Sequence, residues 1–189
     1  MLKAPRVGLV KTRLGRQVGF DQATRVYRAM AERQVGRVPE TFRLEVHYAP
    51  RGAGAEMRAW LGTARHYCVQ SGGDLGRRLT SAFARAFRRG AHEVIAIGAD
   101  CPGLDGDCLA EASSRLRKAD VVLGPAADGG YYLIGLRRPV PELFTAIAWS
   151  SEKVLSQTLE RAAAGGLSCE LLSIKEDIDD LESLRRHLS

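Results

Sequence analysis

The sequence of 189 residues lacks several features that would place it in a particular class of protein. It has no run of 18 consecutive apolar residues, so we expect no membrane-spanning helix, and its basic N-terminus is not followed by the apolar run of a signal peptide. Its four histidines show no metal-binding spacing to one another, and its cysteines fit no zinc pattern such as CxxC. We therefore expect a soluble, cytoplasmic protein with reduced cysteines.

Lysine is also scarce, because all but five of the 28 basic residues are Arg. The net charge of +6 favours anionic partners in general, such as nucleotides and phosphates. A chain so rich in Arg and Ala is also typical of a GC-rich genome, so the charge identifies no partner. There is no internal repeat, low-complexity segment or interdomain linker, and we expect a single domain over residues 1–189.

Two kinds of segment alternate along the chain. Short apolar segments rich in β-branched residues predict strands at 42–49, 94–97, 121–123, 131–136 and 169–174. Apolar residues three or four apart predict helices near 21–31, 75–87, 109–116, 154–162 and 179–188, the first of them capped by Asp21. The alternation predicts an α/β fold, an open and mostly parallel sheet with helices on both faces. Because such sheets bind ligands beyond the carboxyl ends of their strands, the loops after strands are the candidate sites.

The loop 98–104, with the sequence GADCPGL, directly follows the strand predicted at 94–97. Asp100 therefore lies where a ligand would bind. A carboxylate there can hold a hard cation, and Mg²⁺ commonly uses one or two carboxylates together with substrate phosphates. Spacing alone leaves open an equal alternative, in which Asp100 caps a turn before the next helix.

The loop 124–132, with the sequence GPAADGGYY, follows the next predicted strand. Asp-Gly-Gly is also the signal of a plain hairpin turn, and the local sequence favours that interpretation of Asp128. However, Asp100 and Asp128 each follow a predicted strand, so both could reach one metal ion. The paired glycines, Gly129 and Gly130, would let a substrate approach the backbone.

Basic residues gather near the start of the chain, at Lys3, Arg6, Lys11, Arg13 and Arg16. The glycine that precedes the lysine of a Walker A loop is missing. Such a loop can still contact phosphates, or it can be a solvated basic face, and the sequence alone favours neither. We expect no nucleic-acid binding, since no aromatic residues interleave with the basic ones.

Polar residues before three predicted helices have simpler explanations. Asp74 follows Gly72-Gly73 and is expected to cap a helix, although glycines before a helix N-terminus also suit an anion. Ser150 or Ser151 is expected to cap the helix predicted near 154–162. The last helix is preceded by Asp177, Asp179 and Asp180. Capping and the helix dipole explain these three, though one of them could reach the metal.

Six motifs together resemble a known family. In chain order they are KAPRVGLVKTRLG, GGDLGRRL, GADCPGL, GPAADGGYYLIGL, AWSSEKVL and DIDDLESL. They resemble the bacterial transferase-1 proteins associated with radical-SAM/selenodomain gene clusters, which are classed as GT-A-type glycosyltransferases. A more distant similarity is to 2-phospholactate guanylyltransferase and molybdenum cofactor guanylyltransferase, which transfer a nucleotidyl group with Mg²⁺. It rests on the basic loop at Lys11–Leu14, on Asp100-Cys101-Pro102 and on Asp128-Gly129-Gly130.

The resemblance implies a single GT-A-like, Rossmann-type domain and a metal-dependent transferase, most simply a glycosyltransferase that uses a nucleotide sugar and a small-molecule acceptor. It implies Mg²⁺ or Mn²⁺ held by Asp100 and Asp128. The residues expected to contact nucleotide or substrate are Lys3, Lys11, Thr12, Arg13, Gly73, Asp74, Gly129, Gly130, Tyr131 and Trp149. The alternatives are a nucleotidyltransferase that takes a nucleoside triphosphate and releases pyrophosphate, and a non-catalytic nucleotide-binding protein.

The sequence departs from the family pattern in three places. The family begins with an apolar strand before the Lys-Ala-Pro element, and only Met1-Leu2 precede it here, so either the true start lies upstream or the first strand is truncated. The usual Thr after the last Asp-hydrophobe-Asp is Asp180. The familiar Trp-Ser-Thr is Trp149-Ser150-Ser151, which keeps a hydroxyl group. The resemblance indicates neither a catalytic base nor an oligomeric state.

Overall fold

The computed structural model describes residues 1–188, with residue 188 described by its backbone alone. The chain forms two compact units, each built from segments that are distant in sequence. Unit 1 comprises Met1–Gln70, Gly98–Gly106 and the segment from Glu176 onward, and unit 2 comprises Ser71–Ile97 and Asp107–Lys175. The single domain expected over residues 1–189 stays a prediction.

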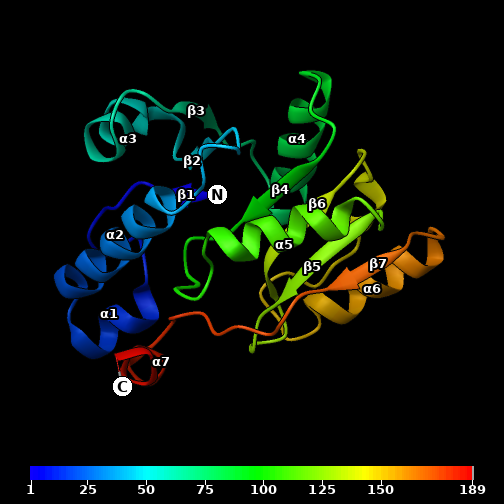
Figure 1. The fold of residues 1–189 in the computed structure, drawn as a ribbon. Coiled ribbons are helices and arrows are strands. Elements are labelled where there is room, and N and C mark those ends of the chain that lie inside the picture. Colours follow the sequence, from blue (N-terminus) through cyan, green and yellow to red (C-terminus); the bar gives the residue numbers. More distant parts are fainter. Residues whose placement is uncertain (189) are drawn as a thin grey trace. The chain divides into compact units, whose positions relative to one another are not determined.

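Unit 1 contains a three-stranded sheet in the order β1-β2-β3 (Figure 1). Its strands are β1 (Leu2–Lys3), β2 (Glu45–Ala49) and β3 (His66–Val69), and both strand pairs are parallel. Its helices are α1 (Thr12–Val18), α2 (Phe20–Gly36), the short 3-10 helix η1 (Arg51–Ala53), α3 (Gly54–Leu61) and α7 (Leu181–Leu188). β3 was not expected from the sequence, because its residues HYCV begin with an exposed histidine and form no apolar run.

The core of unit 1 lies between this sheet and the helices α2 and α3. Val46 and Tyr48 of β2 pack in one buried cluster with Tyr27 and Ala31 of α2 and Met57 of α3. The alternation expected over 42–49 is confirmed at these two strand residues. Because successive side chains of a strand point to opposite faces, the intervening residues of β2 lie on the other face of the sheet.

Unit 2 contains a four-stranded sheet in the order β4-β6-β5-β7. The strands are β4 (Val94–Ile97), β5 (Val121–Pro125), β6 (Tyr131–Leu136) and β7 (Cys169–Leu171). Its helices are α4 (Leu75–Arg88), α5 (Gly106–Leu116), the 3-10 helix η2 (Pro141–Phe144) and α6 (Val154–Ala164). The α/β fold expected from the alternation of segments is thus confirmed.

The strand β6 differs from expectation in its direction. It runs antiparallel to both β4 and β5, whereas β5 and β7 are parallel. Its apolar sequence is equally suited to either direction, because the strand is largely buried on both faces. The connection decides the matter, since a parallel pair needs a crossover of a dozen or more residues and residues 126–130 form only a short turn.

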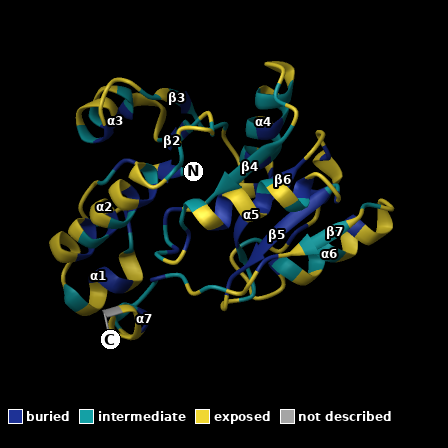
Figure 2. Cartoon of the chain, in the orientation of Figure 1, coloured by how far each residue is buried: buried dark blue, intermediate teal, exposed yellow. Residues whose placement is uncertain are grey.

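The core of unit 2 lies along β5 and β6, whose residues are mostly buried (Figure 2). All five residues of β5 are buried, and Val121 and Leu123 pack with Ile134 of β6. Phe83 of α4 joins this cluster and stacks on Phe144, with the ring centroids 5.7 Å apart. The two apolar strands predicted on either side of the Asp-Gly-Gly motif therefore form the centre of the sheet.

The helix ends agree with the sequence in one case and differ in two. Asp74 caps α4, because its side chain accepts a hydrogen bond from the backbone N–H of Arg77. Asp21 lies within the first turn of α2 rather than at its cap, where its charge still suits the helix dipole. The cap of α6 is Lys153, without a side-chain hydrogen bond. The expected caps, Ser150 and Ser151, lie before it, and Ser151 Oγ accepts a hydrogen bond from the Lys153 N–H.

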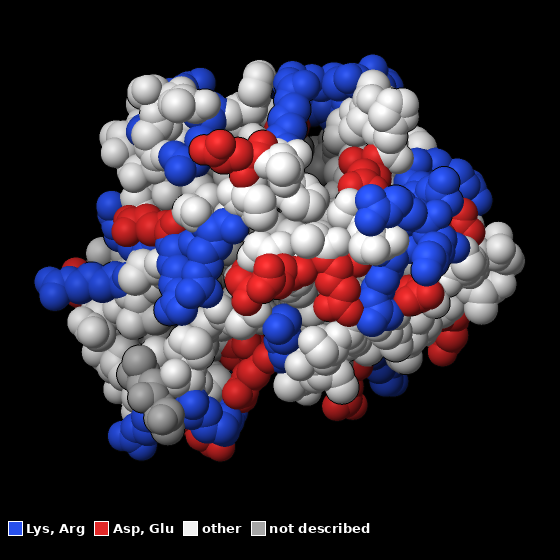
Figure 3. All heavy atoms as spheres, in the orientation of Figure 1, with Lys and Arg blue, Asp and Glu red and all other residues white. Residues whose placement is uncertain are grey.

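The surface carries charges of both signs. On the face shown in Figure 3, acidic and basic side chains are interspersed, and basic ones gather over the end of α4, whose last turn contains Arg85 and Arg88. Within residues 1–188, none of the helices is both long and apolar enough to cross a bilayer.

Candidate functional site

Lys11 has an unusual conformation directly before α1. Its backbone φ of 45° and ψ of 46° lie in the left-handed region, which costs a residue with a side chain roughly 1–2 kcal/mol. Its side chain is only 5% exposed. A buried charge on a strained backbone needs a compensating interaction, and two carboxylates supply it.

Asp100 and Asp179 both contact the Lys11 ammonium group. Nζ lies 3.0 Å from Asp100 Oδ1 and 2.8 Å from Asp179 Oδ1, and it donates a hydrogen bond to Asp179. Burial lowers the pKa of Lys11, but the negative charges of Asp100 and Asp179 outweigh this effect, so the pKa is raised above its ordinary value. All three residues belong to unit 1, and we call them the cation cluster.

The carboxylate of Asp100 is buried at one oxygen and accessible as a whole. Its Oδ1 atom is buried 3.0 Å from the Lys11 ammonium, whose pKa this contact raises. The side chain as a whole is 42% exposed, so the carboxylate can be reached from solvent. Two carboxylates that converge on one cationic centre form the oxygen donor set that a hard divalent ion prefers.

The structure separates the roles of the aspartates before α7. Asp180 caps the helix, since its Oδ1 accepts a hydrogen bond from the Ser183 N–H at 2.9 Å. Asp179 instead reaches Lys11, 168 residues away in the sequence. Sequence reasoning assigned both residues to capping, because an aspartate before a helix needs no further explanation. The only sequence signal for Asp179 is its place in an acidic segment, one of whose aspartates was expected to be able to reach the metal.

The other unit 1 residues expected at the site lie on its surface. Lys3 is an exposed residue of β1, and its backbone N–H donates to the Tyr27 hydroxyl at 2.8 Å. Thr12 and Arg13 open α1 and are also exposed. Their side chains are thus available to a ligand, and their contact with phosphates stays a prediction.

In unit 2, the segment before α4 has the local geometry that its sequence indicated. Asp74 Oδ1 accepts a hydrogen bond of 2.9 Å from the Arg77 N–H. Gly73 has a φ of +97°, a conformation that disfavours residues with a side chain. Capping is therefore confirmed as the local role of Asp74, and a role in seating a nucleotide stays a prediction.

The Asp-Gly-Gly motif forms a tight turn between β5 and β6. Asp128 Oδ1 accepts a hydrogen bond of 2.9 Å from the Gly130 N–H. Gly129 has a φ of +85°, and a Cβ atom there would lie 2.3 Å from the carbonyl oxygen of Glu152. The turn conformation and the close approach of this backbone both require glycine at position 129.

Tyr131 and Trp149 pack against each other in unit 2. Their ring centroids are 6.5 Å apart and their planes are nearly perpendicular, and burial raises the pKa of Tyr131. Gly76, in the first turn of α4, lies against the same indole, since a Cβ atom there would be 2.8 Å from Trp149 Nε1. The start of α4, the start of β6 and the segment around Trp149 therefore meet in one place.

The expected metal ligands fall in different units. Asp100 belongs to unit 1 and Asp128 to unit 2, so a metal ion held by both stays a prediction. Within unit 1, the carboxylate beside Asp100 is that of Asp179.

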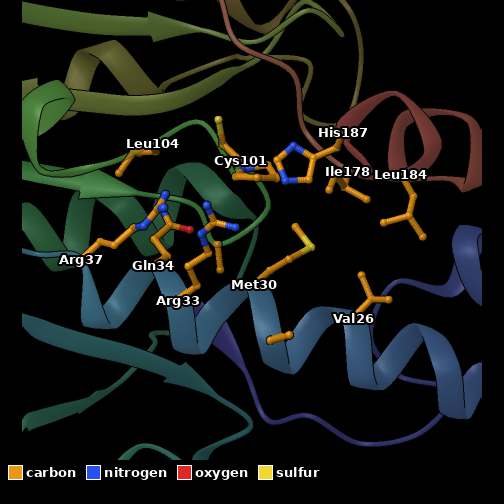
Figure 4. A pocket seen from close by; sticks show the side chains of 13 residues that line it. Val26, Met30, Arg33, Gln34, Arg37, Cys101, Leu104, Ile178, Leu184 and His187 are labelled. Carbon is orange, nitrogen blue, oxygen red and sulfur yellow. The ribbon is translucent and has the colours of Figure 1, made fainter. Parts of the chain in front are cut away.

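A pocket of about 220 Å³ lies within unit 1 (Figure 4). Its lining includes Ala99 and Cys101, which flank Asp100, and Ile178, which precedes Asp179. None of the three residues of the cation cluster lines it. The pocket is therefore separate from the cation cluster. It is also smaller than the roughly 300–1,000 Å³ of most small-molecule sites, which makes it too small for a nucleotide sugar.

The sequence profile of one family matches residues 16–151, which is more than half of the chain. That family is described as "Uncharacterized protein conserved in bacteria (DUF2064)". The chain belongs to the DUF2064 family. None of the curated proteins matches this DUF2064 chain.

A solved structure extends the similarity over nearly the whole DUF2064 chain. A proposed nucleotide-diphospho-sugar transferase from Desulfovibrio desulfuricans G20 is 34% identical, with a TM-score of 0.92, over 97% of this chain and 81% of that chain. The fold is therefore that of the nucleotide-diphospho-sugar transferases, as the motifs implied. The narrower family associated with radical-SAM/selenodomain gene clusters stays a prediction.

More distant structures share the fold at lower identity. Rv0371c of Mycobacterium tuberculosis H37Rv, solved in complex with manganese, is 17% identical over 85% of this chain and 84% of that chain, with a TM-score of 0.56. A CMP:2-keto-3-deoxy-manno-octonic acid synthetase complexed with CTP is 11% identical over 85% of each chain, with a TM-score of 0.56.

Proposed function

We propose that this DUF2064 protein is a metal-dependent transferase that acts on a nucleotide-activated donor, and that the donor is a nucleotide sugar. The observation that carries the proposal is the convergence of Asp100 and Asp179 on one buried cationic centre. An open α/β sheet binds its ligands at the loops after its strands, and Asp100 lies in the loop that follows β4.

The residues of the cation cluster suit a divalent ion. Asp100 and Asp179 provide carboxylate oxygens, the ligands that Mg²⁺ and Mn²⁺ prefer, and their side chains are 42% and 43% exposed, so an ion can reach them from solvent. An ion held there with the donor diphosphate would neutralise negative charge on the leaving group. Asp128 is the further ligand expected from the sequence.

Lys11 contributes a second positive charge at the same place. In the structure its ammonium is balanced by the two carboxylates. Once a divalent ion takes up the charge of Asp100 and Asp179, the Lys11 ammonium is left to pair with a phosphate oxygen, which it binds as a point charge. Arg13, exposed on the first turn of α1, would supply a planar guanidinium to the same diphosphate.

The compared structures support the same class of reaction. The Desulfovibrio desulfuricans protein is a proposed nucleotide-diphospho-sugar transferase, and its identity of 34% over most of both chains favours a nucleotide sugar donor. The manganese complex of Rv0371c favours a divalent ion among proteins of this fold.

A second candidate is a nucleotidyltransferase that uses a nucleoside triphosphate. The observation that favours it is the synthetase of the same fold that was solved with CTP. Both reactions break a bond next to a metal-bound diphosphate, so the cation cluster serves either one. The products differ, because glycosyl transfer releases a nucleoside diphosphate and nucleotidyl transfer releases pyrophosphate. The same products separate both reactions from a non-catalytic nucleotide-binding protein, which releases neither.

The test is nucleotide affinity, measured by calorimetry with nucleoside diphosphates in the presence of Mn²⁺, Mg²⁺ or EDTA. Asp100→Asn and Asp179→Asn keep the size of each side chain but remove its charge. We expect each to weaken metal-dependent binding ten-fold or more, about 1.4 kcal/mol. Asp128→Asn should show a smaller loss if Asp128 is a further ligand.

The matched control is Asp180→Asn, one residue from Asp179. Asp180 caps α7, and Asn caps a helix about as well as Asp, so this variant should bind as the wild type does. Wild-type binding that is indifferent to EDTA, or Asp100→Asn and Asp179→Asn variants that bind like Asp180→Asn, would contradict the metal site.

A further inference from the structure

Three side chains of different chemistry meet on the sheet of unit 1, away from the cation cluster. They are Glu45 and His47 of β2 and Cys68 of β3. One ligand atom from each, a carboxylate oxygen, an imidazole nitrogen and the sulfur, lie within 4.8 Å of one another. Nothing in the proposed transferase function uses these residues.

The sheet itself places the three residues on one face. Glu45 and His47 are two residues apart on β2, so their side chains point to the same side. They alternate with Val46 and Tyr48, which face the core shared with α2 and α3. Cys68 is the register partner of His47 across the parallel pair β2–β3, and paired residues of neighbouring strands share a face. Backbone pairing therefore holds the three donors together.

The distances between the donor atoms suit a tetrahedral ion. His47 Nε2 lies 3.4 Å from Glu45 Oε2, and Cys68 Sγ lies 3.7 Å from the same oxygen. Around Zn²⁺, with bonds of about 2.0–2.3 Å, tetrahedral geometry separates neighbouring ligand atoms by about 3.3–3.7 Å. A small movement of the side chains would thus be enough to place one ion among all three.

The burial of the site suits the same ion. The side chain of Glu45 is 15% exposed and that of His47 13%, and Cys68 is 3% exposed. A thiolate, an imidazole and a carboxylate with little solvent around them form a site for Zn²⁺ rather than for Mg²⁺, which prefers oxygen ligands and keeps several waters.

We propose that Glu45, His47 and Cys68 form a zinc site that joins β2 to β3. It has three protein ligands, so a water molecule completes the tetrahedron. Binding deprotonates the Cys68 thiol and releases its proton to solvent, so the affinity falls as the pH is lowered. The site is independent of the proposed transferase function, because its donor set selects a different metal and none of its residues belongs to the cation cluster.

The competing explanation needs no metal. The Cys68 thiol can donate a hydrogen bond to Glu45, and protonated His47 can form an ion pair with the same carboxylate. Both explanations place the three side chains together, so the geometry alone does not separate them. They differ in whether the protein binds Zn²⁺ and Co²⁺ in solution.

The experiment uses the full-length protein, freed of metal with a chelator and titrated with Co²⁺. We expect one tightly bound ion per chain, with the near-ultraviolet thiolate charge-transfer band and the intense visible bands of a tetrahedral cobalt–thiolate centre, both abolished by one equivalent of Zn²⁺. Cys68→Ser should remove the charge-transfer band and weaken Zn²⁺ binding about 100-fold or more, at least the cost of losing an outer-shell partner. His47→Gln and Glu45→Gln should weaken Zn²⁺ binding as well.

Two controls of the same residue types lie in unit 2, away from the site's sheet. His92→Gln removes an exposed histidine, and Cys169→Ser removes a half-buried cysteine. Both variants should keep the spectrum and the affinity. If the Cys68 variant does not fold, Cys101→Ser, Cys108→Ser and Cys169→Ser identify the thiolate by elimination, because the sequence has four cysteines.

Wild-type protein that binds no Zn²⁺ or Co²⁺ in a one-to-one ratio overturns the proposal and leaves the hydrogen-bonded trio. A spectrum without a thiolate band, or one that Cys68→Ser leaves unchanged, overturns it too. These outcomes say nothing against the transferase, whose test follows nucleotide binding through Asp100 and Asp179.

Discussion

The backbone N–H of Ile178 donates a hydrogen bond of 2.9 Å to the carbonyl oxygen of Asp100. Ile178 is 3% exposed, so its buried side chain anchors this connection. The bond joins the loop after β4 to the segment before α7, and it fixes the backbone of Asp100 next to that of Asp179. The two carboxylates are therefore positioned by main chain and core packing, and their charges can be changed by substitution without moving the loops.

Lys11→Met should have opposite effects on the affinity for metal and on the affinity for nucleotide. The substitution removes the ammonium that balances Asp100 and Asp179, so the carboxylates should bind Mn²⁺ about ten-fold more tightly in the absence of nucleotide. Nucleotide affinity at saturating Mn²⁺ should fall by a similar factor, because a phosphate contact is lost. Electron paramagnetic resonance measures the first quantity and calorimetry the second. Arg13→Met, which removes an exposed charge from α1, should leave Mn²⁺ affinity unchanged.

The same lysine should make the stability of the protein depend on alkaline pH. Its pKa is raised in the folded state, since the charges of Asp100 and Asp179 outweigh burial. Its contribution to the free energy of unfolding is thus fully present below the unfolded pKa of about 10.4 and is lost as the pH rises through the folded value. Urea unfolding between about pH 9 and 12 should show, above about pH 10.4, a decline in the wild type that is smaller in Lys11→Met. Parallel declines would mean that Lys11 is not the group responsible.

Glycine at position 129 should be far harder to replace than glycine at position 166. Both have positive φ, which costs alanine roughly 1–2 kcal/mol. A Cβ atom at Gly166 meets nothing within 4 Å, whereas one at Gly129 would overlap the Glu152 backbone. We expect Gly129→Ala to lower the free energy of unfolding by roughly 2–5 kcal/mol, since overpacking adds to the strain. Equal losses for the two variants, in equilibrium urea unfolding, would contradict the close approach.

Replacing Gln34 should stabilise the protein. Its side chain lies in the wall of the unit 1 pocket, and its buried Nε2 atom has no hydrogen-bond partner among the described residues. A buried donor left unpaired costs about 1–3 kcal/mol, so Gln34→Met, with a similar volume, should raise the free energy of unfolding by about 1 kcal/mol. Gln17→Met should have the opposite sign, because Gln17 Oε1 accepts a hydrogen bond from the Leu181 N–H. A loss of stability in Gln34→Met would contradict the prediction that the unpaired amide is costly.

The sequence was sufficient for features that depend on local pattern. The alternation of apolar segments predicted the α/β class, and the N-cap at Asp74 was expected from one polar residue before an amphipathic helix. Asp100 was placed in a loop after a strand by simple adjacency to residues 94–97. Each of these predictions uses residues that are neighbours in the chain.

Features that depend on distant parts of the chain were not predictable in this way. The contact between Lys11 and Asp179 spans 168 residues, and each residue alone had an adequate local explanation. The left-handed backbone of Lys11 has no sequence signal, since that conformation is expected of glycine or asparagine. Cys68 could not be placed beside His47, because the short strand β3 was itself unforeseen and a strand pair is needed to bring them together.

The order in which the chain is made sets the order in which its interior charges can be neutralised. At a translation rate of about 5–20 residues per second, Asp179 is synthesised on the order of ten to thirty seconds after Lys11. During that interval the nascent chain can offer Lys11 the carboxylate of Asp100 but not that of Asp179. A chain that ends before α7 therefore has a lysine destined for the interior with only one of its two carboxylate partners.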